Sequence, residues 1–348
     1  AAQRAALREP CAALREALFH ADGARAAGRH WYGAADAALA ATFALEDAPE
    51  DVASECLTVL AARAGLGDES IHEAAAGDVA RCLHAAGSCA LLLLAAAEDL
   101  GAALKKRAVP APAKAPVDGD DDDLAAAADT GGADAEREAR LARLVEEEIV
   151  GAAAEARGLV ACFGPVAAKV ASRALARRGA VPPVLHRSAT LCLAKMACVS
   201  RGVCETHLPL LVTTLARAPD AAARTNVAVA LGDLASRQPN SVEPWTDHVY
   251  GALRDSDPDV RAAVLATLAH LALNDMIKAR GGGVAEVALL VVDADDRIRR
   301  RARAFFDELH KKSTATTSPI YNLLPDVVSR LSAARRAPPK APAPPVAA

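Results

Sequence analysis

An arginine recurs along the second half of the chain at intervals of 37, 37 and 38 residues: Arg187, Arg224, Arg261 and Arg299. Mostly apolar residues follow each arginine at three, seven and ten positions further on. They are Thr190, Val227, Val264 and Ala302, then Ala194, Leu231, Leu268 and Phe306, and then Ala197, Leu234, Leu271 and Leu309. These spacings place the three positions on one face of an α-helix. The period therefore predicts one amphipathic helix after another, each opening near an arginine.

A second apolar set follows the first and predicts a second helix in each repeat: Leu211, Val249 and Val287. A fixed period of two amphipathic helices is typical of an α-solenoid, and this period lies just below the usual range of HEAT repeats. The composition agrees, because 52% of residues are hydrophobic but only 3% are aromatic. We therefore expect an all-α fold, an α-α superhelix of HEAT repeats.

The repeat at Asp257-Pro258-Asp259 suggests why the arginine recurs. Asp257 can cap a helix, Pro258 suits its first turn, and Asp259 places negative charge where the helix dipole favours it. Arg261 would then lie one turn into the helix, where it can contact an acidic residue of the neighbouring repeat. We interpret Arg187, Arg224, Arg261 and Arg299 as a structural ladder between repeats.

The same region resembles the C-terminal HEAT region of the condensin complex subunit 1 family, over about 150 residues. The likeness is carried by these segments in order: Arg224-Thr225-Asn226, Ala230 to Leu234, Pro239-Asn240, Pro244-Trp245-Thr246, Leu253-Arg254-Asp255, Asp275 to Lys278, Phe305-Phe306, and Ile320 to Asp326. Two features depart from the family pattern. The loop from Ser313 to Pro319 is longer, and a proline-rich stretch replaces the expected helix after Ser332.

The resemblance implies a non-catalytic scaffold subunit of condensin in mitotic chromosome condensation. Its implied partners are a kleisin, the SMC ATPase subunits and chromosomal DNA, bound without sequence specificity. ATP hydrolysis would belong to the SMC heads, and the implied location is the nucleus and its chromosomes, with a cytoplasmic pool also possible. A second interpretation remains open: a generic HEAT adaptor in transport or signalling that holds peptides on its concave face.

Composition shifts suggest four segments. Residues 1–106 are predicted to form helices without a clean period, and residues 135–332 to form the HEAT-repeat domain. Residues 107–134 between them contain seven acidic and two basic residues with three prolines, a composition that predicts a disordered linker. Residues 333–348 are rich in proline and are predicted to be a disordered tail. Because the chain begins with alanine and is much shorter than the family, we expect it to be a fragment.

Several kinds of chemistry are not expected from the motifs. The sequence has no glycine-rich phosphate loop, HExxH pair or GxSxG elbow, so we expect no enzyme, cofactor, metal or small-molecule substrate. The eight cysteines form no CxxC pair and are interpreted as buried free thiols. The apolar run from Ala90 to Ala97 is too short to span a bilayer, so no membrane partner is expected. The glycines Gly281 to Gly283 are interpreted as the cap and turn after a helix ending near Arg280.

A basic cluster near the end of the repeats is the candidate DNA-binding site: Arg297, Arg299, Arg300, Arg301, Arg303, Lys311 and Lys312. A helical projection sets the arginines opposite the apolar stripe, on the solvated side, where guanidinium groups can contact phosphates. The alternative is a solvated face partly neutralised by nearby acids. The one Ser-Pro site, Ser318-Pro319, is a candidate for phosphorylation by a proline-directed kinase.

Overall fold

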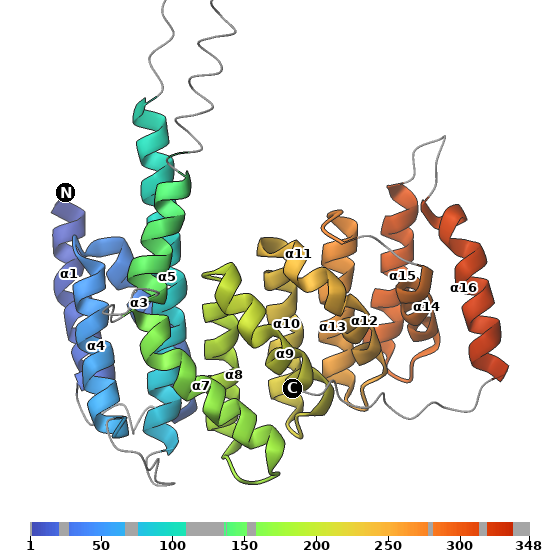
Figure 1. The fold of residues 1–348 in the computed structure, drawn as a ribbon, viewed down its shortest axis with the longest axis horizontal. Coiled ribbons are helices and arrows are strands. Elements are labelled where there is room, and N and C mark those ends of the chain that lie inside the picture. Colours follow the sequence, from blue (N-terminus) through green and yellow to red (C-terminus); the bar gives the residue numbers. More distant parts are fainter. Residues whose placement is uncertain are drawn as a thin grey trace, which may run out of the picture. The chain divides into compact units, whose positions relative to one another are not determined.

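A computed structural model describes residues 2–20, 28–66, 76–108, 136, 138–151, 158–277, 281–312 and 319–336 (Figure 1). All regular structure in these ranges is helical, so the predicted all-α class is confirmed. The chain divides into two compact units, residues 1–166 and 167–348. The predicted linker 107–134, the tail 333–348 and Ser318 lie wholly or mostly outside the described residues.

The first unit is a bundle around one long helix. Its helices are α1 (Ala2–Arg15), the π-helix η1 (Glu16–His20), the short 3-10 turn η2 (Gly28–His30), α3 (Trp31–Leu45), α4 (Pro49–Ala64), α5 (Ala76–Ala108) and the π-helix η4 (Val145–Val150). Both α3 and α4 pack on α5, and η4 packs on α5 as well. The core contains the fully buried Trp31, whose indole Nε1 donates a hydrogen bond of 3.0 Å to the carbonyl of Leu18. Helix α7 (Leu159–Ala176) crosses the boundary between the units.

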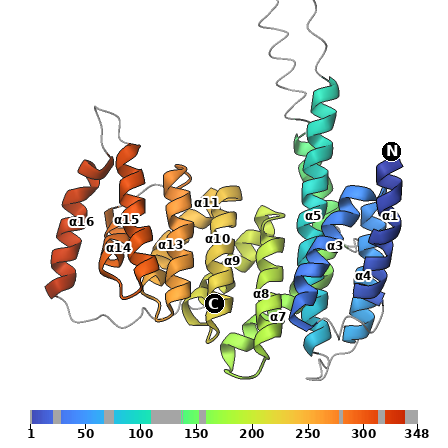
Figure 2. The ribbon, with the colours of Figure 1, turned by 180° about the vertical axis from the view of Figure 1, so that it is seen from behind.

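The second unit is a two-layer helical array. Its first layer is α8 (Pro183–Ala197), α10 (Ala221–Arg237), α13 (Pro258–Leu273) and α15 (Asp296–Lys311), each packed on the next (Figure 2). Its second layer is α9 (Arg201–Arg217), α12 (Thr246–Gly251), α14 (Gly281–Leu289) and α16 (Pro319–Arg336), which contact one another in that order. The short elements α11 (Pro239–Val242), η5 (Glu243–Trp245), η6 (Ala252–Arg254) and η7 (Leu290–Val292) complete the connections. Alternation of the layers along the chain is the HEAT-type arrangement that the period predicts.

Local sequence explains where the first-layer helices begin. Asp257 caps α13 by accepting hydrogen bonds from the backbone N–H groups of Asp259 and Val260, at 2.9 and 3.3 Å. Asp295 caps α15 in the same way, with 2.8 Å to the N–H of Arg297. Such caps satisfy N–H groups that have no partner inside the helix.

The periodic apolar positions form the core between the layers. Eleven of the twelve first-helix positions are buried, as are Leu211, Val249 and Val287 of the second helices. The exception is Phe306, which is half-buried and packs against Val284, Ala285 and Val327.

The structure differs from two sequence expectations. The segment after residue 135 groups with the first unit, because η4 packs on α5, whereas the sequence places it in the repeat domain. The glycines Gly281 to Gly283 begin helix α14 instead of ending the preceding one. A side chain at Gly283 would meet the ring of Tyr250, with its Cβ 2.3 Å from Cζ. Glycine is favoured at position 283 because the ring of Tyr250 packs closely against the start of α14, and not because the backbone turns there.

Two helices are long and apolar enough to cross a membrane by length and composition alone, Ala76–Lys106 and Leu159–Ala176. The expectation from the sequence considered only the eight apolar residues from Ala90 to Ala97, whereas the apolar helix that contains them is much longer. In the first helix 67% of the apolar window is buried inside the structure, and in the second helix 33% is buried.

Candidate functional site: an arginine–aspartate ladder and its basic end

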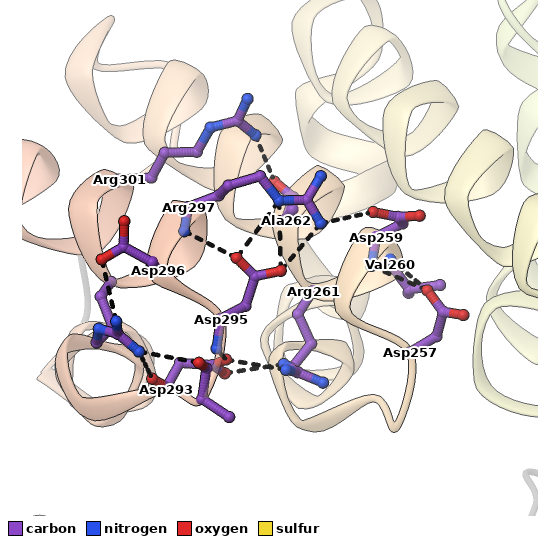
Figure 3. Close-up of polar contacts among 12 residues, drawn as sticks. Asp257, Asp259, Val260, Arg261, Ala262, Asp293, Asp295, Asp296, Arg297 and Arg301 are labelled. Carbon is purple, nitrogen blue, oxygen red and sulfur yellow. Dashed lines mark hydrogen bonds and ion pairs between the residues drawn. The ribbon is translucent and has the colours of Figure 1, made fainter.

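Three of the recurring arginines each bind a carboxylate of the next repeat in two parallel hydrogen bonds. Arg224 donates from Nε and Nη2 to Asp255 at 2.7 and 2.8 Å, and Arg261 donates from the same atoms to Asp293 at 2.9 Å each. Arg187 binds Asp220 likewise, with 2.8 Å from Nη2 to Oδ1. Figure 3 shows the Arg261–Asp293 contact. Bidentate geometry fixes the orientation of both groups, so each contact ties one repeat to the next in a single register.

The remaining guanidinium nitrogen holds the loop before the arginine's own helix. Nη1 of Arg261 donates to the carbonyls of Asp255 and Ser256 at 2.9 and 3.2 Å. Arg224 makes the same bonds to Ala218 and Pro219, and Arg299 makes them to Asp293 and Ala294. One side chain thus organises its own loop while it binds the next repeat.

Two of these inter-repeat contacts are largely shielded from solvent. The side chains of Arg261 and Asp293 are 15% and 8% exposed, and those of Arg224 and Asp255 are 11% and 12% exposed. The hydrogen bond from Arg261 lowers the pKa of Asp293 from its ordinary value, although burial acts in the opposite direction. Arg187 lowers the pKa of Asp220 in the same way. Since both carboxyl pKa values are depressed by folding, these contacts stabilise the array above about pH 4 and weaken as the pH falls further.

The aspartate partners were not identified from the sequence, which predicted only that some acidic residue would be contacted. The sequence nevertheless contains a pattern that could have identified these aspartates. The pairs Asp255/Asp257 and Asp293/Asp295 repeat at the same interval as the arginines. In each pair the first carboxylate accepts from the backbone N–H of the second at 2.8 Å and binds the preceding arginine, while the second caps the helix.

The helical projection predicted that the five arginines of α15 lie on a solvated side; Arg297, Arg300, Arg301 and Arg303 are exposed, whereas Arg299 is half-buried. Arg299 lies in the ladder position, and Arg301 is directed toward the carbonyl of Ala262 on the preceding first-layer helix, at 3.4 Å. Arg297 bridges Asp259 and Asp295 at 3.0 and 2.9 Å (Figure 3). Its hydrogen bonds lower the pKa of Asp295 to about 2. Arg297 and Arg301 lie on the side of α15 that faces α13, although both side chains remain exposed.

Two exposed arginines of the cluster have no hydrogen bond or ion pair to α13 among the described residues. Arg300 is exposed and pairs with Asp296 one turn earlier at 2.6 Å, and Arg303 is exposed with no ion pair among the described residues. Lys311 pairs with Glu308 at 2.6 Å, and Lys312 pairs with Asp275 at 2.8 Å. The candidate DNA-binding residues are therefore split between neutralised pairs and a small open group around Arg303.

His186 lies buried beside the first ladder contact. Its Nε2 has no hydrogen-bond partner in the part of the chain that the structure describes. Burial lowers the pKa of His186 from its ordinary value, which the nearby Asp220 partly opposes. No group of three or more His, Cys, Asp or Glu side chains within the described ranges could hold a metal ion.

A pH dependence follows from His186. Because folding depresses its pKa, the unfolded chain binds the extra proton, and stability should fall as the pH drops below about 6.5. Urea denaturation at pH 7.5 and 5.5 should show this loss, and His186→Leu should reduce it. A part should persist, because burial lowers the pKa of His207 as well. An unchanged pH dependence in His186→Leu would contradict the assignment.

Comparisons with known proteins concern the same array. Residues 222–340 match the model of a family described as non-SMC mitotic condensation complex subunit 1. Condensin complex subunit 1 of Xenopus laevis is 46% identical over 150 residues, 43% of this chain and 11% of that protein. The Mus musculus protein of that name is 40% identical over 204 residues, 58% of this chain and 14% of that protein. The Saccharomyces cerevisiae protein is 39% identical over 150 residues, 43% of this chain and 12% of that protein.

The chain spans about a tenth of the length of the curated relatives that it matches. The matched residues are those that build the layered helices from α10 onward. Residues 222–340 are therefore similar to the family of non-SMC mitotic condensation complex subunit 1, and the relatives at 39–46% identity carry the name condensin complex subunit 1.

Proposed function

We propose that this chain is a scaffold part of a condensin complex and acts in mitotic chromosome condensation without catalysing a reaction itself. The observation that carries the proposal is the family match over the helices of the layered array, at 46% identity to a condensin subunit. The ladder supports a scaffold role, because bidentate contacts between repeats hold their register and so the positions of surface residues. The partners in this proposal are a kleisin and the SMC subunits, whose heads hydrolyse ATP.

The location of the chain in dividing cells tests this proposal. A fluorescently tagged copy of the chain, expressed in dividing cells of its source, should concentrate on mitotic chromosomes. Depletion of an SMC condensin subunit should release it. Uniform cytoplasmic signal through mitosis, or chromosome binding that persists after SMC depletion, would contradict a role inside condensin.

We also propose that the open side of α15 contacts duplex DNA without reading its sequence. Arg300 and Arg303 are exposed, and guanidinium groups suit contact with phosphate oxygens. Lys311 at the end of the same helix adds an exposed cation. Such backbone contacts carry no base information, and their strength falls with salt.

Changing Arg300 and Arg303 together to glutamate should weaken binding equally for unrelated duplexes. The slope of log affinity against log salt should fall by up to about two units, one for each phosphate that is no longer neutralised. The matched control is the same change at Arg201 and Arg217, which are exposed on α9 of the second layer. Binding by fluorescence anisotropy across a salt series measures both. Equal losses of affinity in the two double variants would show a general charge effect and no site on α15.

A further inference from the structure

An acidic and a basic residue occupy the same repeat position on two neighbouring helices. Two residues before the ladder arginine stand Asp259 on α13 and Arg297 on α15, which lie 38 residues apart. Because stacking sets equal repeat positions side by side, Nη2 of Arg297 reaches the carboxylate of Asp259 at 3.0 Å (Figure 3). The two earlier repeats have Leu185 and Ala222 at this position. This contact is therefore an addition to the ladder and not one of its members.

The charges around Arg297 oppose the approach of an anion. Arg297 also binds Asp295 at 2.9 Å, so one guanidinium lies between two carboxylates and the three groups carry one net negative charge. The carboxyl of Asp295 stays ionised at neutral pH, because these contacts lower its pKa to about 2. The side chains of Asp259 and Arg297 are 72% and 59% exposed, so the negative charge faces solvent.

The two carboxylates differ in what they do for the fold. Asp295 caps α15 by accepting from the backbone N–H of Arg297 at 2.8 Å, so the helix start requires it. Helix α13 is capped by Asp257 instead, and among the described residues the ion pair of the Asp259 carboxylate is with Arg297. An ion pair this exposed stabilises a fold only weakly. The carboxylate of Asp259 can therefore be removed without loss of the array.

We propose that Asp259 restrains contact between DNA phosphates and the arginines at the junction of α13 and α15, Arg297 and Arg301. This inference rests on the proposed DNA contact of α15 and concerns its regulation. Arg301 is exposed on the same side, directed toward the carbonyl of Ala262. A phosphate must compete with Asp259 for Nη2 of Arg297, and it is repelled by the exposed carboxylate as it approaches. Asp259 thus lowers the affinity of a surface whose arginines otherwise suit phosphate oxygens.

Asp259→Asn in the full chain tests the restraint, because it removes the charge with little change of shape. Fluorescence anisotropy of a labelled short DNA duplex, measured across a salt series, should show affinity raised about threefold. The slope of log affinity against log salt should steepen by up to about one unit, because one more phosphate can be neutralised. In a chain that already carries Arg297→Gln, the same change should give a much smaller gain. Asp247→Asn is the control, an exposed acid on α12 of the second layer, and should leave the affinity unchanged.

Two results would overturn the restraint and leave the DNA contact standing. One is an affinity unchanged by Asp259→Asn while Arg300 and Arg303 changed to glutamate still weaken binding. The other is an equal gain from Asp259→Asn with and without Arg297→Gln, or an equal gain from Asp247→Asn, which would show a general effect of charge. No measurable binding by either the parent or Asp259→Asn would contradict the DNA contact as well. Thermal unfolding of Asp259→Asn should match the parent, which excludes loss of the fold as the cause.

Discussion

Replacing Arg261 with alanine is expected to lower the free energy of unfolding of the array by about 2–4 kcal/mol. The change removes two hydrogen bonds to Asp293 and two to the loop carbonyls of Asp255 and Ser256. It also leaves the carboxylate of Asp293, only 8% exposed, without its arginine. A buried charge that loses its partner costs far more than an exposed one, which is why this effect should be large.

The control is Arg254→Ala in the same repeat. Arg254 also forms a bidentate pair, with Glu286, but its side chain is 58% exposed. An exposed ion pair contributes at most about 1 kcal/mol. Urea denaturation followed by circular dichroism should separate the two variants clearly. Equal effects in both would mean that shielding from solvent does not decide how much the ladder stabilises the array.

Gly283→Ala is expected to destabilise the array by about 1–3 kcal/mol, an effect opposite in sign to the usual preference for alanine in helices. The new Cβ would lie 2.3 Å from Cζ and 2.5 Å from Cε1 of Tyr250, whose ring is buried between repeats and cannot easily move. Thermal unfolding of the single variants measures the destabilisation. Adding Tyr250→Leu to Gly283→Ala should cost less than the sum of the two single changes, because the clash disappears.

Gly251→Ala provides the comparison. Gly251 ends α12, and a side chain there would meet no atom within 4 Å. This variant should be neutral or slightly more stable, because alanine loses less backbone entropy than glycine. If both alanine variants were equally stable, the close approach of Tyr250 to Gly283 would be wrong.

The layered array could be predicted from the sequence because its period is long and regular. Register between the first-layer helices follows from that period, so the positions of Val227, Leu231 and Leu234 in the core could be read directly. The partner of each arginine could not be predicted as easily. Asp293 lies 32 residues after Arg261, in a loop, and becomes its neighbour only once the stacking of α13 and α15 is known.

Packing between helices also explains which features could not be predicted from the sequence. Glycines after a helical stretch ordinarily signal its end, and nothing local reveals that the ring of Tyr250 approaches Gly283. A helical projection treats α15 as isolated, so it cannot reveal that Arg297 pairs with Asp259 and that Arg301 contacts the carbonyl of Ala262, both on α13. In the first unit, alanine-rich helices without a clean period gave no register. The packing of η4 on α5 therefore could not be predicted from the sequence.

The central claim is that this chain works as part of a condensin complex, and recovery of its partners tests it most directly. The tagged chain should be isolated from native mitotic extract, and the co-purifying proteins identified by mass spectrometry. The account predicts SMC and kleisin subunits of condensin at levels comparable to the bait. Recovery of transport or signalling factors without any SMC subunit would contradict it and would favour a peptide-binding HEAT adaptor.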